Sequence, residues 1–307
     1  MRVFVTGASG FIGSAVVPEL IGAGHEVVGL ARSDASADAL AAAGAKVHRG
    51  ALQDLDSLRA GATSADGVIH LAFVHDFSDY ARSVQTDLHA VETIGEALED
   101  SGKPFVITAG TLMLAILGRL ATEEDVSDPA LPRVASENTA IALAERGVRS
   151  SVVRLAPSVH GEGDTGFVPR LIAIARDKGV SAFVDDGSNR WPAVHRLDAA
   201  RLFRRAAEAA PAGSRLHGAD DEGVPFREIA ETIGSQLQLP VLSIAAEDAE
   251  EHFGFLSAFV SLDNPTSSAL TQQRLGWSPE GPGLIADLEQ GHYFNGLTVN
   301  LAQQSQV

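Results

Sequence analysis

The stretch Val3-Phe4-Val5-Thr6-Gly7-Ala8-Ser9-Gly10-Phe11-Ile12-Gly13 decides the fold of this chain. An apolar run typical of a strand leads into three glycines spaced three residues apart, and a helical pattern follows over Phe11–Ala23. Gly7 permits a tight turn, Gly10 lets the backbone approach a ligand, and Gly13 lets the helix pack closely. Because the N–H groups that open such a helix bind phosphate, the stretch predicts a dinucleotide site; a glycine-rich turn without a ligand is the alternative.

Short β-rich runs alternate with helical patterns as far as Leu155. The predicted strands are Val3–Val5, Val27–Leu30, Lys46–His48, Gly67–Leu71, Phe105–Thr108 and Ser151–Leu155, and the predicted helices are Phe11–Ala23, Ala35–Ala43, Leu55–Ala60, Asp79–Ser101 and Val134–Arg146. Repeated βα units need right-handed crossovers, so the pattern predicts an α/β fold with a Rossmann-type, doubly wound parallel sheet. We expect its strands to be apolar throughout, as in sheets buried on both faces.

The pattern changes after Pro157, where glycines, prolines and short helices interrupt shorter strands. We therefore expect a dinucleotide-binding Rossmann domain over residues 1–157. Residues 158–307 are expected to form mainly a smaller C-terminal substrate-binding lobe, partly interleaved with the sheet.

Composition excludes several classes of protein. The chain has 307 residues, 45% of them hydrophobic, which is ample for a large core. A net charge of −17 argues against nucleic-acid or anionic-membrane partners. The absence of cysteine excludes disulfides and thiolate chemistry. With neither a signal peptide nor an apolar run of membrane-spanning length visible, we expect a soluble cytoplasmic protein.

The segment Thr6–Gly13 resembles the cofactor fingerprint of the extended and atypical short-chain dehydrogenases/reductases, the NAD-dependent epimerase/dehydratase group. Later segments resemble this family in the same order, strongly as far as Pro157. The resemblance implies a cofactor site made by Gly7, Ser9, Gly10, Phe11, Ile12 and Gly13 at the first turn, Asp54 and Leu55 at the adenine, Leu71, Ala72 and Phe73 beside the fourth strand, Thr108 after the fifth, and Pro157 beside the nicotinamide.

The end of the second predicted strand favours NADP(H) over NAD(H). An NAD site normally offers a carboxylate here to the ribose hydroxyls, whereas this chain has Ala31 followed by Arg32 and Ser33. A guanidinium and a hydroxyl suit a 2′-phosphate, which a carboxylate would repel. In the alternative, Arg32 is an ordinary surface residue and Asp34 or Asp38 reaches the ribose.

The catalytic pair that is usual in this family is absent. Relatives use a tyrosine, with a lysine four residues later that lowers the tyrosine pKa, so that the phenol exchanges a proton while hydride moves. The tyrosines here are Tyr80 and Tyr293, and neither has a lysine four residues on. Counting from the fifth strand places the two positions near Arg133 and Glu137.

Another group must then supply the proton in a reductase. Thr108 and Thr111 stand where the family has its serine or threonine, and Thr111 is preferred because Thr108 can be occupied by the cofactor. Tyr80 and His75 are the other candidate donors, with surface positions as the alternative for both. Arg133 is expected in the substrate pocket, where it polarises an oxygen or holds an anion.

The predicted substrate pocket is apolar. The segment Thr111–Leu117, which includes Met113, is almost wholly hydrophobic, and no cationic cluster for a nucleotide diphosphate accompanies it. His160 and Trp191 are expected as further pocket residues, with core packing as the alternative for Trp191. A metal bound by His160, Glu162 and Asp164 is considered and rejected, because a glycine-rich loop of this kind is more often simply polar.

Together these features predict an NADPH-dependent oxidoreductase that reduces an apolar ketone or a related C=O or C=N compound. Two alternatives stay open. One is an epimerase, isomerase or lyase that uses the same cofactor, and the other is a non-catalytic NADP(H)-binding regulator. The resemblance also implies a homodimer formed through helices that flank the sheet, a role for which Asp79–Ser101 and Val134–Arg146 are available.

Overall fold

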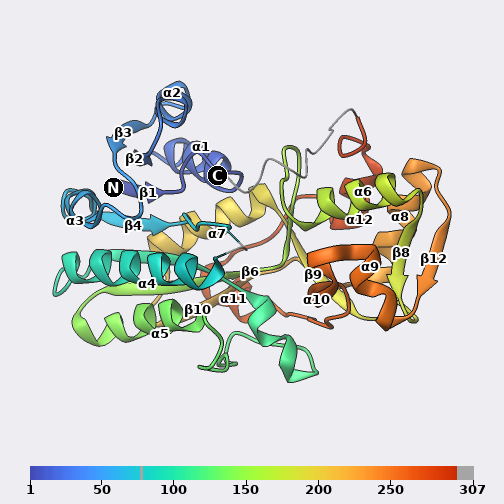
Figure 1. The fold of residues 1–307 in the computed structure, drawn as a ribbon. Helices are drawn as coiled ribbons and strands as arrows, with labels where there is room; N and C mark the ends of the chain where they lie inside the picture. Colours follow the sequence, from blue (N-terminus) through green and yellow to red (C-terminus); the bar gives the residue numbers. More distant parts are fainter. Residues whose placement is uncertain (77–78, 296–307) are drawn as a thin grey trace.

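A sheet of seven parallel strands organises the computed structural model, which describes residues 1–76 and 79–295 (Figure 1). The strand order is β10-β6-β5-β4-β1-β2-β3. The strands are β1 (Arg2–Thr6), β2 (Glu26–Ala31), β3 (Lys46–Arg49), β4 (Gly67–His70), β5 (Pro104–Gly110), β6 (Arg149–Leu155) and β10 (Ser214–Gly218). The order reverses direction between β1 and β4, so ligands are expected in the crevice at their carboxyl ends. The predicted doubly wound fold is confirmed.

Helices cover both faces of this sheet. One face carries α1 (Gly13–Gly22), α2 (Asp34–Ala42) and α7 (Arg196–Ala209), and the other carries α3 (Leu55–Thr63), α4 (Tyr80–Ala97) and α5 (Val134–Ala142). Two hydrophobic cores follow, one on each side of the strands. The helix predicted over 134–146 is α5 followed by a 3₁₀ turn, η2 (Leu143–Arg146), and another 3₁₀ helix, η1 (Thr111–Leu117), follows β5.

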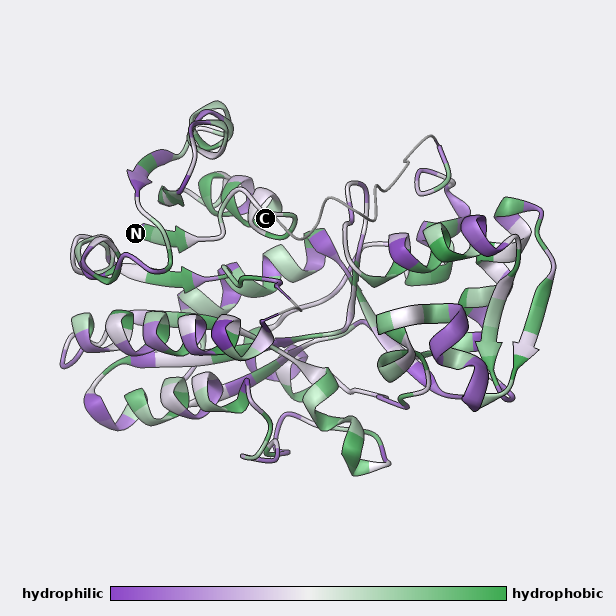
Figure 2. Ribbon diagram, in the orientation of Figure 1, coloured by the Kyte–Doolittle hydropathy of each residue, from purple (hydrophilic) through white to green (hydrophobic). Residues whose placement is uncertain are grey.

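The expectation that every strand is apolar is wrong for β3. This strand reads Lys46-Val47-His48-Arg49, and three of its residues are exposed. It pairs only with β2 and therefore forms one edge of the sheet, where Figure 2 shows its hydrophilic colouring. Charged side chains on an edge strand hinder pairing with another chain.

A smaller unit lies beside the carboxyl ends of the main sheet (Figure 1). Its strands are β7 (Ser158–His160), β8 (Ser181–Val184), β9 (Arg190–His195), β11 (Asp221–Pro225) and β12 (Val241–Ile244), arranged as β11-β9-β7 and β12-β8. The surrounding helices are α6 (Phe167–Lys178), α8 (Phe226–Leu237), α9 (Ala249–Phe253), α10 (Ser257–Val260) and α12 (Leu284–Glu289), with 3₁₀ turns η3 (Ala246–Asp248) and η4 (Gly254–Leu256). We call this unit the second lobe.

The chain crosses between the two units more than once. After β7, α6, β8 and β9 it returns to the main sheet, where α7 packs on α1 and β10 pairs with β6. It then enters the second lobe again at β11, and a short helix, α11 (Ala269–Leu275), contacts β10. Residues after 157 thus contribute to both units; residues 296–307 of the predicted second domain lie outside the described part of the chain. Within the described residues, no helix is long and apolar enough to cross a membrane.

Candidate active site

The glycine-rich turn leaves no room for side chains. Gly7 has a φ of +66°, and a Cβ there would lie 2.7 Å from the backbone nitrogen of Ala72. A Cβ on Gly13 would lie 2.1 Å from the carbonyl oxygen of Gly7. Gly10 donates its own N–H to that carbonyl oxygen over 3.0 Å. The turn therefore packs against the end of β4 and the start of α1, as a dinucleotide cradle requires.

An arginine from α7 lies over this turn, and sequence reasoning missed it. The Arg196 guanidinium stacks 5.0 Å from the Phe11 ring centroid and donates to Ser14 Oγ over 3.4 Å and to the Glu162 carbonyl oxygen over 2.6 Å. Since α1 begins without a side-chain cap, its first N–H groups face the same region. Ser9 and Gly10 are exposed beside it. Because Arg196 lies 183 residues beyond Gly13, no local motif signals this contact.

The end of β2 lies beside two arginines and one carboxylate that is paired with a cation. Ala31 is buried, while Arg32 and Ser33 are exposed. The Ser33 hydroxyl caps α2 by accepting the N–H of Ser36 over 3.2 Å. Asp34 forms an ion pair with Arg49 at the end of β3. Asp34 therefore has a cationic partner, and two arginines, rather than a lone carboxylate, mark this edge.

The residues expected at the adenine lie at the next loop. Asp54 caps α3, because its carboxylate accepts the N–H of Ser57 over 3.0 Å. Leu55 follows with 37% of its surface exposed. A polar cap and an exposed apolar side chain at the same strand edge give a base both an acceptor and a surface on which to rest.

A buried polar chain supports the end of β4. His70 Nδ1 lies 2.8 Å from Thr6 Oγ1, and His70 Nε2 lies 3.3 Å from the carboxylate of Asp87 on α4. Thr6 Oγ1 also accepts the N–H of Ala72 over 3.3 Å. Burial works to raise the pKa of Asp87, but the hydrogen bond and charge of His70, together with Arg133 and Ser136, outweigh burial and lower it. His70 is thus a satisfied core residue, and it fixes Leu71 and Ala72 beside the glycine turn.

Phe73 is the centre of an aromatic and cationic cluster at the carboxyl end of the sheet. Its ring centroid lies 5.1 Å from that of His75 and 6.2 Å from that of Tyr80, and the Arg133 guanidinium stacks on it at 4.0 Å. Arg133 also donates to the Thr108 carbonyl oxygen over 3.3 Å. The structure therefore brings together four residues that the sequence suggested separately.

Electrostatics distinguishes the two candidate donors in this cluster. Partial desolvation of the His75 ring, reinforced by the positive charges of Arg133 and Arg170, lowers the pKa of His75 below its ordinary value of 6.5. A lowered pKa reduces the protonated fraction of the imidazole at neutral pH, so His75 is a weaker source of a proton there. The Tyr80 phenol needs no charge to donate, and 37% of its side-chain surface is exposed.

Thr111 lies deeper than expected. It is fully buried, and its hydroxyl accepts a hydrogen bond from Asn264 Nδ2 over 3.1 Å. Met113 on the same 3₁₀ helix is half-buried against the core, while Ile116 is exposed. Pro157 is half-buried after β6. Thr111 therefore reaches a substrate oxygen only if the Asn264 contact is rearranged.

Arg133 and Glu137, near which counting along the sequence predicted the tyrosine and lysine positions, make other contacts in the structure. Arg133 caps the start of α5, and Glu137 lies one turn later with its side chain fully buried. Glu137 forms ion pairs with Arg154 on β6 and with Arg215 on β10, the latter over 2.7 Å. Burial works to raise the Glu137 pKa, but the two arginines outweigh it and lower the pKa. Glu137 is therefore part of an ion-pair network that joins α5, β6 and β10.

Two residues expected in the substrate pocket belong to the core of the second lobe. Trp191 is fully buried, with its ring 5.5 Å from Phe167 and 5.1 Å from Phe226. His160 is also fully buried and contacts the Asp287 carboxylate over 2.8 Å. Trp191 thus has the core contacts that were the alternative to a pocket wall, and a role of either residue in the pocket stays a prediction.

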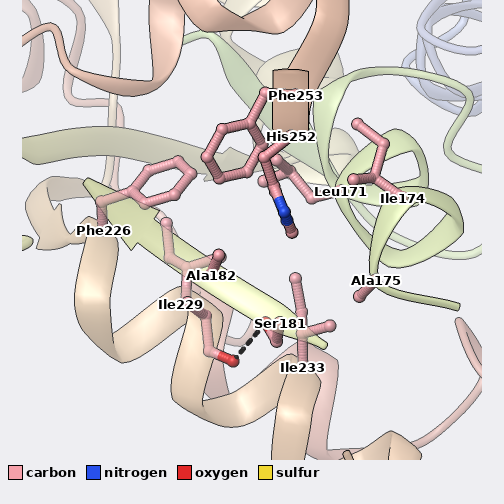
Figure 3. A pocket seen from close by; sticks show the side chains of 11 residues that line it. Leu171, Ile174, Ala175, Ser181, Ala182, Phe226, Ile229, Ile233, His252 and Phe253 are labelled. Atoms are coloured by element: carbon pink, nitrogen blue, oxygen red, sulfur yellow. Dashed lines mark hydrogen bonds between the residues drawn. The ribbon is translucent and has the colours of Figure 1, made fainter. Parts of the chain in front are cut away.

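Nothing in the described part of the chain groups three or more metal-ligating side chains into a metal site. An apolar gap does lie in the second lobe between α6, α8 and α9, where Leu171, Ile229 and Phe253 point toward one another (Figure 3). It is lined by core residues of that lobe and none of the cofactor-turn residues. The candidate active site is therefore the end of the main sheet around Phe73.

Comparison with known proteins defines the class of this fold and site. A model of the NAD dependent epimerase/dehydratase family matches residues 3–217. The chain belongs to this family and is an epimerase/dehydratase-family oxidoreductase.

Individual relatives differ in what is known of them. An uncharacterized protein of Schizosaccharomyces pombe is 52% identical over 96% of this chain and 100% of its own length. A 4-hydroxy-2-methyl-3-oxo-4-farnesyl-3,4-dihydroquinoline-1-oxide ketoreductase of Stigmatella aurantiaca is 27% identical over 83% of this chain and 80% of its own. The dTDP-glucose 4,6-dehydratase of Streptomyces venezuelae, solved with NAD and TYD bound, shares the fold with a TM-score of 0.76 at 21% identity, over 96% of this chain and 98% of its own.

Proposed function

We propose that this protein is an NADPH-dependent reductase of an apolar carbonyl compound or its C=N analogue. The observation that carries the proposal is the cluster around Phe73, which places a phenol, an imidazole and a guanidinium beside an aromatic face at the carboxyl end of β4. This edge of a doubly wound sheet is where such folds bind ligands. The ketoreductase from Stigmatella aurantiaca gives a precedent for carbonyl reduction among relatives.

The glycine turn fits a dinucleotide, because the missing side chains of Gly7 and Gly13 let the turn pack directly on the backbone of Ala72 and of Gly7 itself, as the tight turn of such a site requires. Gly7, Ser9, Gly10, Phe11, Ile12 and Gly13 would hold the pyrophosphate side, with Arg196 above them. When bound, the nicotinamide supplies the hydride. Leu71, Ala72, Phe73, Thr108 and Pro157 would border its ring, and Asp54 and Leu55 the adenine.

The preference for NADP(H) rests on the end of β2. Arg32 is exposed there, and Arg49 lies near enough to bind Asp34. Two guanidinium groups and the N-terminus of α2 would stabilise a 2′-phosphate, whereas Asp34 is already paired with a cation. The alternative in which Asp34 reaches a ribose hydroxyl requires it to leave Arg49.

Within the cluster we assign the proton to Tyr80. Its phenol is exposed beside Phe73 and can donate directly or through water. His75, with its lowered pKa, is the second candidate, and Thr111 would act by holding the substrate oxygen after releasing Asn264. Arg133 would orient the substrate through its guanidinium.

The first experiment titrates the pure protein with NADPH and NADH, and then follows nicotinamide absorbance with aryl and alkyl ketones and imines. We expect tight NADPH binding and turnover of apolar carbonyl compounds. Binding of both redox forms without turnover would favour a regulator, for which the missing tyrosine–lysine pair is the specific argument. Interconversion of a substrate without net change in NADPH would favour an epimerase, isomerase or lyase.

A further inference from the structure

Arg196 reaches the glycine turn from the segment that leads back out of the second lobe. It is the first residue of α7 and directly follows β9, the central strand of the β11-β9-β7 sheet. Its guanidinium lies 5.0 Å from the ring centroid of Phe11, in the turn that precedes α1. Because α7 also packs on α1, the backbone that carries this arginine is fixed to the main sheet beside the proposed dinucleotide site.

The guanidinium of Arg196 has hydrogen-bonding capacity that the protein does not use. Its Nη1 donates to the Glu162 carbonyl oxygen over 2.6 Å, and its Nη2 makes a long contact of 3.4 Å with Ser14 Oγ. Its Nε is buried and has no hydrogen-bond partner. A buried N–H without an acceptor costs free energy, which a bound anion would remove. The edge formed by Nε and Nη2 therefore has donors for two oxygens of one phosphate, the arrangement in which arginine binds phosphate.

Within the part of the chain that the structure describes, no carboxylate forms an ion pair with Arg196. Two acidic residues close to its contacts have other partners, because Asp198 pairs with Arg201 and the Asp164 carboxylate accepts the Tyr293 hydroxyl over 3.0 Å. The first turn of α1 carries no acidic residue either. The positive charge of the guanidinium at this turn therefore has no carboxylate bound to it, which suits an anionic ligand.

The loop that accepts the Nη1 hydrogen bond joins Arg196 to the second lobe. Gly161 has a φ of +134°, and a Cβ there would lie 2.9 Å from Arg196 Cγ, so the loop backbone packs directly on the arginine side chain. The Gly161 N–H donates to Tyr293 Oη over 2.9 Å, and the same hydroxyl donates to Asp164. Residues 161–164 are thus held by Arg196 and by Tyr293, and a ligand that fixes the guanidinium also fixes this loop.

We propose that Arg196 binds the pyrophosphate of the dinucleotide through its Nε and Nη2 edge, and that this contact fixes residues 161–164 against the glycine turn. The inference rests on the dinucleotide site of the proposed function and adds to it a positioning residue from outside the N-terminal motif. Phosphate oxygens would accept the N–H groups that the arginine leaves unpaired, together with the first N–H groups of α1. Cofactor binding would then strengthen the connection between the second lobe and the main sheet.

Calorimetric titration of the full chain with NADPH, NADH and 2′-AMP tests the phosphate contact. Both dinucleotides carry the pyrophosphate, so R196Q should weaken both by a similar factor, roughly 10- to 100-fold. 2′-AMP lacks the pyrophosphate and should bind R196Q and the wild type equally, which also shows that the variant is folded. The matched control is R204Q, because Arg204 lies two turns further along α7 and pairs with Glu19 of α1 over 2.6 Å. That variant should leave all three affinities unchanged.

Hydrogen exchange with and without saturating NADPH tests the effect on the loop. NADPH should slow exchange in residues 161–164 of the wild type and of R204Q, and should not do so in R196Q. Unchanged dinucleotide affinities in R196Q, or an equal loss of 2′-AMP affinity, would overturn the pyrophosphate contact. Equal protection of the loop in R196Q and the wild type would overturn the link to the second lobe.

These outcomes differ from those that test the proposed function. A wild type that binds neither dinucleotide would refute this inference and the proposed function together. The expected losses in R196Q, in a protein that turns over no carbonyl compound, would sustain the role of Arg196 and refute the reductase.

Discussion

The two halves of the main sheet differ in the kind of contact that restricts which residues they can carry. In the half formed by β1, β2 and the glycine turn, backbone contacts leave no space for a Cβ at Gly7 or Gly13. In the half formed by β5, β6 and α5, the strands pair as in the rest of the sheet, but Arg133 and Glu137 contact their neighbours through their side chains. Backbone packing thus restricts the residue types allowed in the half with the glycine turn, which we call the cofactor half. In the other half, contacts between side chains allow the residue types to change together.

The largest effect on stability is expected at the ion pairs of Glu137. Glu137→Gln would leave Arg154 and Arg215 buried without a counter-charge, and should lower the free energy of unfolding by about 3–5 kcal/mol. Chemical denaturation measures this change. Glu137→Lys, which would place a third cation beside Arg154 and Arg215, should be worse still. A stable Glu137→Lys variant would show that these ion pairs do not hold α5 to the sheet.

The Glu137 carboxylate should also make the free energy of unfolding fall at acid pH. Its pKa is lowered in the folded protein, so the stabilisation is complete above the ordinary glutamate value of 4.5 and is lost as pH falls through the lowered value. Glu137→Gln should therefore flatten the decline in stability below about pH 4.5 relative to the wild type. Denaturation curves collected across this range test the sign.

In the cofactor half, Gly13→Ala should cost about 3 kcal/mol of stability and abolish tight NADPH binding, because the new Cβ meets the Gly7 carbonyl oxygen. Gly22→Ala is the matched control, since nothing lies within 4 Å of a Cβ at that position in α1. The control should gain about 0.5–1 kcal/mol. Equal behaviour of the two variants would remove the backbone argument.

For the proposed chemistry, Tyr80→Phe should lower kcat roughly 100-fold while NADPH binding is retained. Tyr293→Phe is the control, because Tyr293 is the other tyrosine and donates to the buried Asp164 carboxylate over 3.0 Å in the second lobe. That variant should lose stability but keep its kcat. If Tyr80→Phe keeps full activity and Thr111→Ala does not, the oxygen-holding threonine is the more important group.

The smallest expected effect is on the preference for NADPH over NADH. Arg32→Ala should weaken NADPH binding roughly 10-fold and leave NADH binding unaltered, because only NADPH carries the 2′-phosphate. Arg59→Ala, which removes another exposed arginine paired with Glu96, serves as the control. Fluorescence titration with both cofactors measures the ratio. An unchanged ratio would return the ribose contact to Asp34 or Asp38.

Sequence predicted the parts of the fold that depend on local pattern. The glycine spacing and the apolar runs of β1, β2 and β4 specify their own conformations, so the doubly wound sheet followed directly. Contacts between distant residues left no such signal. Arg196 over Phe11, Asn264 on Thr111, and the burial of Trp191 and His160 depend on how the second lobe packs.

The return of α7 and β10 to the main sheet has a consequence for the order of synthesis. Until Gly218 has left the ribosome, β6 has an unpaired edge, and the apolar side chains of α1 that later pack on α7 lack this cover. The amino-terminal half therefore cannot complete its core as it emerges, and a chain that stops at Pro157 is expected to aggregate. The main sheet, whose synthesis begins first, is therefore among the last parts of the protein to complete its folding.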